Sequence, residues 1–378
     1  MVNRALGEGL DAAAASRSLF RDWVEPLSDS FTSAGVRQYV DEFAYVIAQG
    51  LPQFPASMLA SRYERIRIPR RFTGDAAAVK DVVILSRVTL GADVAVVSVV
   101  IDAARQAFPQ AALHLAGNAK NAELFAGESR LHHLAVPYAR TGALRDRLNA
   151  SASLASAIPP RAIVLDPDSR LSQLGLVPIC DEDRYFFFES RSAGEFGDAT
   201  IGELTALWCR DCFGVPGRPW IAPRYGISQE PSVCISLGTG ENPDKGLGPE
   251  FEAELVRQLA ARGQPILIDK GMGGDEGDRV ERAIASGGVT PDQVKTWLGP
   301  FAPFAFEIAR APMYVGYDSA GQHVAAAAGT PLRCTFAGAQ SKRFFDRWRP
   351  WAQSDSRVTR VDDRTEWRSA LQQLRLAE

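Results

Sequence analysis

The sequence predicts an α/β protein made of two Rossmann-like halves, with a helical stretch in front of them. Short apolar runs rich in valine, isoleucine and leucine alternate with segments of helical periodicity, a pattern typical of parallel sheets covered by helices. The alternation occurs twice, and a proline-rich stretch, 215–231, separates the two sets. With 378 residues, the chain has room for two or three domains. We therefore expect a helical N-terminal extension over 1–75, an N-terminal Rossmann-like domain over 76–222 and a C-terminal Rossmann-like domain over 223–378.

The composition is that of an ordinary globular protein, with 46% hydrophobic and 23% charged residues. A net charge of -3 argues against nucleic acid as a partner, so any phosphate site must be local. Five cysteines scattered in apolar contexts, with no signal-peptide pattern, lead us to expect a cytoplasmic protein. The most apolar run, 94–104, is too short and too polar to span a bilayer, although a peripheral membrane contact is left open.

The first 75 residues have helical periodicity without site chemistry. Prolines punctuate three expected helices, at 6–24, 33–49 and 56–63. We interpret this stretch as a packing or oligomerisation element, and contact between copies of the chain through it is left open.

The two α/β sets follow in order. In the first set we expect strands at 80–86, 111–116, 133–136, 161–166 and 185–189, and helices at 92–108, 118–125, 142–155 and 201–213. In the second set we expect strands at 233–237, 265–269, 294–297, 314–317, 332–336 and 357–361, and helices at 249–262, 275–286, 301–311, 322–328 and 364–376.

The stretch 314–336, YVGYDSAGQHVAAAAGTPLRCTF, is predicted to form strand, tight turn, helix start and strand. Asp318 and Ser319 have side chains that cap helix starts, and the small Ala320 and Gly321 leave the backbone accessible. A helix start of this kind binds anions such as phosphate. The plain alternative is an ordinary α/β unit whose small residues serve close packing, but His323 and its polar neighbours exceed what packing needs.

The segment DSAGQHVAAAAGTP resembles the DSG-x-x-H-x-A-A-A-x-G-T-P signature of glycosyltransferase family 9, the ADP-heptose transferases that build lipopolysaccharide cores. Ala320 stands where the family usually has glycine. The resemblance implies a GT-B fold, in which two Rossmann-like domains face a cleft and the sugar nucleotide lies mostly on the C-terminal half. It also places His323 near the diphosphate.

A second resemblance follows the first predicted strand. The segment SRVTLGAD is similar to the family's S-x-x-L-G-D turn, with Ala92 inserted before Asp93. The resemblance implies that Asp93 is the general base that takes the proton of the acceptor hydroxyl. The alternative from the residues alone is a first-turn acid that stabilises a helix start.

The segment SLGTGENPDKG is predicted to be a strand end followed by a glycine turn. Gly238, Thr239 and Gly240 leave backbone N–H groups free to meet a phosphate. Lys245 resembles the family's loop lysine, which neutralises the departing diphosphate without metal. Here glycine and leucine follow it in place of the family's arginine and tryptophan, and a solvated turn lysine is the alternative.

The segment DKGMGGDEGDR combines a strand end, a glycine turn and acids. By resemblance an acid here binds the nucleoside ribose, and Asp275 or Glu276 fits, because a carboxylate accepts hydrogen bonds from both ribose hydroxyls. Acids that stabilise a helix start are an equally good interpretation.

Acceptor and metal candidates complete the search. Arg170 and Arg191 are predicted to face acceptor anions, or else to form surface salt bridges. The Asp-Pro-Asp sequence at 166–168 is an unlikely metal motif, because metal-binding DxD belongs to one-domain GT-A enzymes. Cys209 and Cys212 form half a zinc site with no second half. We therefore expect no metal and no cofactor beyond a nucleoside-diphosphate sugar as co-substrate.

The sequence thus predicts an inverting glycosyltransferase that moves a heptose-like sugar, by resemblance from ADP-heptose, to an acceptor hydroxyl. The acceptor is left open as a saccharide, a lipid-linked sugar or a protein. Two alternatives remain: a GT-B sugar-nucleotide epimerase, which would need further acids around the sugar, and a non-catalytic nucleotide-sugar-binding subunit.

Overall fold

The computed structural model describes residues 10–138, 142–228, 230–240, 242–290, 292–338, 341–352 and 354–376. The chain divides into two compact units: Met1–Ala122 with Ser129–Arg218, and Glu123–Glu128 with Pro219–Glu378. The passage from one unit to the other after Arg218 therefore lies inside the proline-rich stretch. None of the described helices combines the length and the apolar character needed to cross a membrane.

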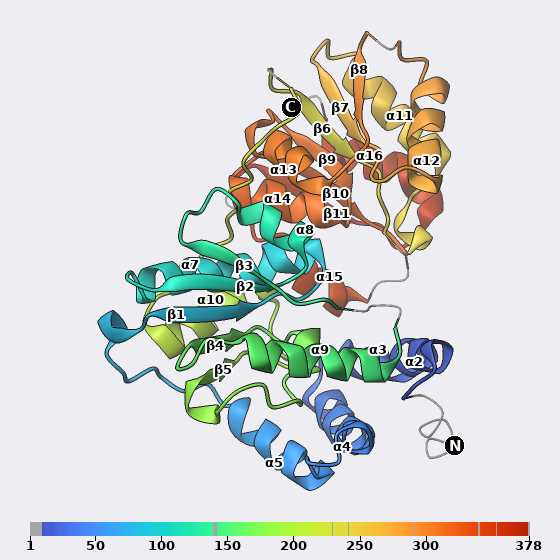
Figure 1. Ribbon diagram of the computed structural model, residues 1–378. Coiled ribbons are helices and arrows are strands. Elements are labelled where there is room, and N and C mark those ends of the chain that lie inside the picture. Colours follow the sequence, from blue (N-terminus) through green and yellow to red (C-terminus); the bar gives the residue numbers. More distant parts are fainter. Residues whose placement is uncertain are drawn as a thin grey trace. The chain divides into compact units, whose positions relative to one another are not determined.

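The first unit is built on a five-stranded sheet in which neighbouring strands all run parallel. The strands are β1 (Asp81–Leu85), β2 (Ala112–Gly117), β3 (Leu131–Ala135), β4 (Ile163–Asp166) and β5 (Tyr185–Phe187). Their spatial order is β3-β2-β1-β4-β5, which is the Rossmann order (Figure 1). Strands β1 and β4 are buried nearly throughout, which explains their continuous apolar sequences.

Helices follow the strands as the alternating pattern predicts. They are α6 (Leu90–Ala92), α7 (Ser98–Ala107), α8 (Ala119–Ala122), α9 (Leu144–Ala157) and α10 (Ile201–Phe213). Helix α10 has a complete capping box, because Thr200 accepts from the backbone N–H of Glu203 and the Glu203 carboxylate accepts from the backbone N–H of Thr200. Gly214, with φ of 76°, ends it in the left-handed conformation.

The N-terminal helices share the hydrophobic core of the first unit. They are α2 (Ala13–Leu19), α3 (Glu25–Ser28), α4 (Ser33–Gly50) and α5 (Ala56–Ile66), with a π-helical turn, Phe20–Val24, between the first two. The start of the helix expected at 6–24 lies outside the described residues. Phe43 and Leu59 are fully buried in the same cluster as Val83 of the sheet. The Tyr63 and Phe187 rings pack edge to face, with centroids 5.6 Å apart.

The second unit is built on a six-stranded sheet, also parallel throughout. Its strands are β6 (Val233–Ser236), β7 (Ile266–Asp269), β8 (Val294–Trp297), β9 (Tyr314–Tyr317), β10 (Leu332–Phe336) and β11 (Ser356–Arg360). The spatial order is β11-β10-β9-β6-β7-β8 (Figure 1). Counted from β6, this is the six-stranded dinucleotide-fold order 3-2-1-4-5-6.

The helices of the second unit are α11 (Pro249–Ala260), α12 (Asp275–Ser286), α13 (Phe301–Arg310), α14 (Ala320–Ala328), α15 (Lys342–Trp348) and α16 (Trp367–Leu374). Helices α11 and α12 contact each other, and so do α13 and α14. The core of this unit includes Ile235 and Ile268 of the sheet and Leu255 of α11.

Each sheet has one topological switch point, where the strand order reverses. It lies between β1 and β4 in the first unit and between β6 and β9 in the second. Open α/β sheets bind ligands at the carboxyl ends of the strands beside such a point. The loops after these four strands are therefore where a site is expected in each unit.

Candidate functional site

The switch point of the second unit brings Lys245 and Asp318 together. Lys245 lies in the loop that follows β6, and Asp318 follows β9. The Lys245 Nζ is 2.7 Å from Asp318 Oδ2, and Gln322 donates a hydrogen bond of 2.8 Å to Asp318 Oδ1. Lys245 keeps about a fifth of its side-chain surface exposed, so the ammonium has access to solvent. Among the described residues, Asp318 is its one carboxylate partner.

The turn from β9 into α14 begins at Ser319, which takes the N-cap position without a capping hydrogen bond from its own side chain. Its hydroxyl instead lies 3.2 Å from the Tyr314 hydroxyl. A Cβ at Gly321 would lie 2.2 Å from the same hydroxyl. The ring of Tyr314 thus occupies the space beside Gly321, so packing explains this glycine, whereas the sequence suggested an accessible backbone. Ala320 begins the helix.

His323 is buried one turn inside α14 and packs edge to face against Trp348, with ring centroids 6.3 Å apart. Burial lowers the pKa of His323 to about 4, with the nearby Asp318 raising it and Lys245 lowering it. The imidazole is therefore neutral at pH 7 and contributes no positive charge to an anion.

Glu276 lies between two glycine turns, at the ends of β6 and β7. A Cβ at Gly238 would lie 2.2 Å from Glu276 Oε1, and one at Gly271 would lie 2.4 Å from Oε2. Burial raises the pKa of Glu276, while Arg279 lowers it. In the described chain no group donates a hydrogen bond to this carboxylate. Asp275 is exposed, so the structure separates the two acids that the sequence left equivalent.

Two exposed apolar side chains accompany Glu276. Met272 is 80% exposed in the turn after β7, and Leu298 is 57% exposed after β8. A Cβ at Gly273 would lie 3.3 Å from the Leu298 side chain, so the two loops touch. The sequence analysis missed both residues, although their places after two neighbouring strands were available as a signal.

The glycine turn after β6 is partly held from within. Thr239 is buried, and its hydroxyl accepts two hydrogen bonds of 3.4 Å from the Arg279 guanidinium. Arg279 also donates 2.9 Å to the Leu237 carbonyl. Gly240 has a φ of 59°, and a Cβ there would meet nothing within 4 Å, so the backbone conformation requires this glycine.

In the first unit, Asp93 lies at the switch point but is completely buried. Its carboxylate accepts three hydrogen bonds of 2.6 Å, from the Ser86 hydroxyl, the Arg87 backbone N–H and the Asn121 amide. Burial raises the pKa of Asp93 to about 6, against these hydrogen bonds, which lower it. The group thus has the basicity of a general base at neutral pH, but its oxygen atoms bind protein.

Asp93 also begins a π-helical turn, Asp93–Val97, between α6 and α7. The expected helix at 92–108 is therefore interrupted by one wide turn. Such a turn accommodates one residue more than a regular helix does, and Ala92 is the residue that the family turn lacks.

The loop after β4 carries a second buried acidic group, Asp166–Asp168. Asp166 accepts from the Tyr185 hydroxyl at 2.5 Å and from the Ser169 N–H at 2.7 Å, and burial raises its pKa to about 6. Asp168 has a φ of 66°, and its Oδ2 accepts from Ser190 at 2.6 Å. No described residue donates to its buried Oδ1.

The two arginines predicted to face an acceptor bind acidic groups of the first unit. Arg191 is buried and pairs with Asp168 at 3.0 Å and with Asp29 of the N-terminal stretch. Arg170 pairs with Glu25 at 3.1 Å. Both arginines thus form ion pairs within the first unit, but the Arg191 pair with Asp168 is buried and is not the surface salt bridge that the sequence offered as the alternative. Binding of an acceptor by either arginine stays a prediction.

The metal candidates are not assembled. Cys209 and Cys212 are buried free thiols, and burial raises the pKa of both. The described residues contain no group of three histidine, cysteine, aspartate or glutamate side chains that could hold a metal ion.

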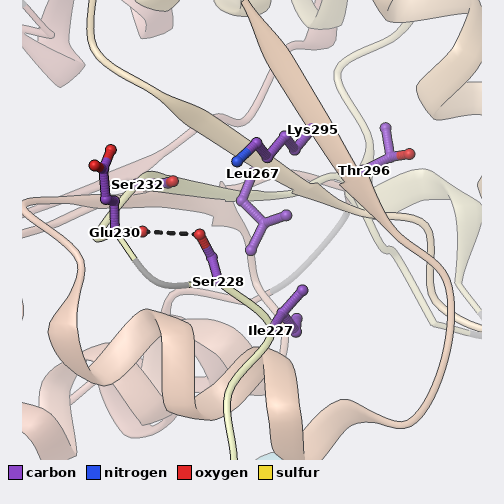
Figure 2. Close-up of a pocket in the computed structure, with 7 residues that line it drawn as sticks. All are labelled: Ile227, Ser228, Glu230, Ser232, Leu267, Lys295 and Thr296. Atoms are coloured by element: carbon purple, nitrogen blue, oxygen red, sulfur yellow. Dashed lines mark hydrogen bonds between the residues drawn. The ribbon is translucent and has the colours of Figure 1, made fainter.

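A hollow of about 670 Å³ in the second unit lies away from these groups. Its lining includes Ser232, which precedes β6, and Leu267 and Lys295 of β7 and β8. Figure 2 shows Lys295 beside Leu267, with Ser228 donating to the Glu230 carbonyl at 3.1 Å. It opens beside the early part of the strands, opposite to their carboxyl ends, so we do not assign the site to it.

Comparison with solved structures identifies the architecture. A family 9 glycosyltransferase from Veillonella parvula matches with a TM-score of 0.56 at 14% identity, over 76% of this chain and 88% of that one. The E. coli ADP-heptose lipopolysaccharide heptosyltransferase II matches with a TM-score of 0.54 at 18% identity, over 78% and 99%. The fold is GT-B.

A third GT-B structure, E. coli heptosyltransferase WaaC with ADP, matches with a TM-score of 0.53 at 14% identity, over 75% of this chain and 94% of that one. No protein-family model and no curated protein sequence matches the chain. The predicted GT-B class is thus confirmed by structure, and the neighbours belong to the family that the Asp318 turn resembles.

Proposed function

We propose that this protein transfers a sugar from a nucleoside-diphosphate donor to an acceptor hydroxyl. The observation that carries the proposal is the cluster at the switch point of the second unit. There Lys245 and the start of α14 supply positive charge at the carboxyl ends of the parallel strands. Glu276 lies at the carboxyl ends of strands in the same sheet. The GT-B likeness to heptosyltransferases supports it.

Each group of this cluster matches one part of a nucleotide sugar. Lys245 and the backbone N–H groups at the start of α14 bind the diphosphate and stabilise its charge as it leaves. Glu276, which lacks a donor among the described residues, accepts hydrogen bonds from the ribose hydroxyls. Met272 and Leu298 give the base an apolar surface. The proposal needs no metal, because lysine and the helix supply the positive charge.

The proposed chemistry is a single in-line displacement. Asp93 takes the proton of the acceptor hydroxyl, and the oxygen forms a bond to the anomeric carbon of the donor sugar. The bond from that carbon to the diphosphate oxygen breaks, and the nucleoside diphosphate leaves with its electron pair. The raised pKa of Asp93, about 6, keeps it ionised yet basic at pH 7.

ADP-heptose is the proposed donor and a saccharide the proposed acceptor. The support is the family resemblance of the Asp318 turn, together with neighbours whose names include ADP and ADP-heptose. A thermal-shift panel of ADP, UDP, GDP and CDP tests the donor. Stabilisation by ADP alone supports the proposal, and stabilisation by none of the four contradicts it. Product analysis with ADP-heptose and a saccharide acceptor then tests transfer.

The complete burial of Asp93 favours a second candidate, a non-catalytic subunit that binds a nucleotide sugar. In that case Asp93 only anchors the turn after β1 through its three hydrogen bonds. The two functions differ in one measurement: the binding subunit binds the donor without releasing nucleoside diphosphate in the presence of any acceptor.

A further inference from the structure

A hollow of about 230 Å³ in the second unit is lined by three arginines and takes no part in the proposed donor site. It lies where α11 begins, beside α12 and the short turn Arg364–Glu366. Its walls include Gly246, Gly248, Glu252, Arg279, Arg282 and Arg364.

The charges around this hollow do not balance. Arg364 pairs with the exposed Asp244 at 3.4 Å. No carboxylate of the described residues lies within ion-pair distance of Arg279 or Arg282, which belong to successive turns of α12. The start of α11 adds the partial positive charge of a helix N-terminus. Three guanidinium groups thus line one hollow, whose lining includes a single acid, the buried Glu252.

Glu252 does not neutralise this charge fully. It is 3% exposed, and its Oε1 accepts a hydrogen bond of 3.1 Å from the Tyr317 hydroxyl. Burial raises the pKa of Glu252 to about 7, although Arg279, Arg282 and Arg364 all lower it. Near pH 7 the carboxyl is therefore partly protonated, and a protonated carboxyl donates a hydrogen bond to an oxyanion instead of repelling it.

We propose that this hollow is an oxyanion site of the phosphoryl class, separate from the donor diphosphate site. Arginine binds the planar oxygen pairs of phosphate and sulfate with two parallel hydrogen bonds, and Arg279, Arg282 and Arg364 can approach one anion from different sides. The oxyanion comes either free, as phosphate or diphosphate, or as a phosphate group on a sugar.

The backbone separates this site from the one at Asp318. Gly246 lines the hollow, whereas the side chain of the preceding Lys245 points to Asp318. Arg279 joins the two regions, because it also donates to the Leu237 carbonyl and the Thr239 hydroxyl. An anion bound to Arg279 would thus stabilise the glycine turn after β6 through these hydrogen bonds. This effect does not depend on whether the protein transfers a sugar.

Calorimetric titration of the full chain at pH 7 in low-chloride buffer tests the site, with sulfate, inorganic diphosphate and glucose 1-phosphate as probes. We expect R282Q and R364Q each to weaken binding about tenfold, because each removes one charge-assisted contact. R257Q removes a charge from the exposed side of α11, where Arg257 pairs with Glu254, and should change affinity less than twofold. Thermal unfolding checks that all variants fold.

The results separate this site from the donor site. If K245Q weakens the three probes while R282Q and R364Q bind them like the wild type, the anion occupies the turn at Asp318 and the proposal is overturned. Absence of binding to the wild type overturns it as well. If glucose 1-phosphate binds more tightly than diphosphate, the natural ligand of the site is a phosphate group on a sugar. If diphosphate binds more tightly, the natural ligand is a free anion.

Sulfate gives a further test, because its charge is constant between pH 6 and pH 8. Glu252 faces Arg279 and Arg282 from α12, Arg364 from its turn and Tyr317 from β9. Sulfate should therefore bind several-fold tighter at pH 6 than at pH 8, and E252Q should remove the difference. A wild-type affinity that is equal at both pH values would contradict the placement of the anion beside Glu252.

Discussion

The Lys245 ammonium and the Asp318 carboxylate lie 2.7 Å apart across the switch point of the second sheet. They are 73 residues apart in the sequence, and only the parallel pairing of β6 with β9 brings them together. The pair holds the lysine at the start of α14. A diphosphate that binds the Lys245 ammonium must therefore displace the Asp318 carboxylate from it.

Replacing Lys245 should weaken nucleoside-diphosphate binding. We expect K245Q to raise the Kd of ADP roughly 10- to 100-fold, because the diphosphate loses its cation and meets an unpaired Asp318. Calorimetric titration with ADP measures the change. K342Q removes an exposed lysine of α15 that pairs with Asp346, and it should bind ADP like the wild type. If the Kd of ADP is unchanged in K245Q, Lys245 does not bind the donor diphosphate.

Glu276 and Asp275 form a matched pair for testing ribose recognition. E276Q should weaken ADP binding about tenfold and leave diphosphate binding unchanged, because the carboxylate accepts from ribose hydroxyls only. D275N removes an equal charge from the neighbouring exposed position and should have little effect. If E276Q and D275N lose ADP affinity equally, the effect comes from the negative charge at the start of α12 and not from a specific contact of Glu276 with the ribose.

Asp93 is tested by binding and turnover together. D93N should lower kcat more than 100-fold and leave the Kd of ADP unchanged, because the ADP groups belong to the second unit. The wild-type rate should fall as pH drops below about 6, where the buried carboxyl takes up a proton. D93N should lose this pH dependence. If the loss of activity in D93N is fully explained by the fraction of the variant that is unfolded, then Asp93 only anchors the turn after β1.

His323 should make the fold sensitive to acid. The pKa of His323 in the folded protein, about 4, is below the ordinary histidine pKa of 6.5, so the unfolded chain binds the proton first as pH falls. Stability is therefore lost between pH 6.5 and pH 4, by roughly 2 to 3 kcal/mol from this residue at pH 4.5.

Urea denaturation of the wild type and H323Q at pH 7.5 and pH 4.5 measures the effect. The buried carboxyls Asp93, Asp166, Glu252 and Asp269 have raised pKa values and act in the opposite direction, so the comparison with H323Q is needed to isolate the histidine. Parallel pH dependences in the two proteins would rule out a buried neutral imidazole.

The N-terminal helices should contribute to the stability of the first unit. F43A should lower the free energy of unfolding by about 3 to 5 kcal/mol, because Phe43 is fully buried in the shared core. Tyr45 lies on the same helix and is 49% exposed, so Y45A should change stability by less than about 1 kcal/mol. Urea denaturation compares the two, and a mild effect of F43A would make the helices a loosely attached element.

The sequence predicted the alternating strands and helices well, because buried parallel strands have unmistakable apolar runs. The strand expected at 161–166 matches β4, and the helix expected at 275–286 is α12. Among the edge strands, β8 matches the range expected for it, 294–297, but β3 was predicted less well. Strand β3 spans Leu131–Ala135 instead of 133–136, because an edge strand with two exposed histidines lacks a continuous apolar pattern.

The site was predictable only where its chemistry follows a strand end directly. Glu276 could be proposed from the sequence, but not its preference over Asp275, since that depends on the two glycine turns that enclose it. The fate of Arg191 was not predictable either. Its partner Asp29 is 162 residues away, and no local pattern in a single sequence indicates such a pairing. The buried state of Asp93 similarly depends on Asn121 from α8.

The wide turn Asp93–Val97 has a consequence for how relatives of this protein are found. A wide helical turn can accommodate an added residue. The aspartate then moves by one position in the sequence, while the strand before it and the helix after it stay in the same positions in the fold. A search that demands glycine and aspartate as neighbours passes over such a chain, whereas one that permits a single insertion there would collect it. Distant relatives of this protein with the same widened turn are therefore expected to be recognised by their structure before they are recognised by their sequence.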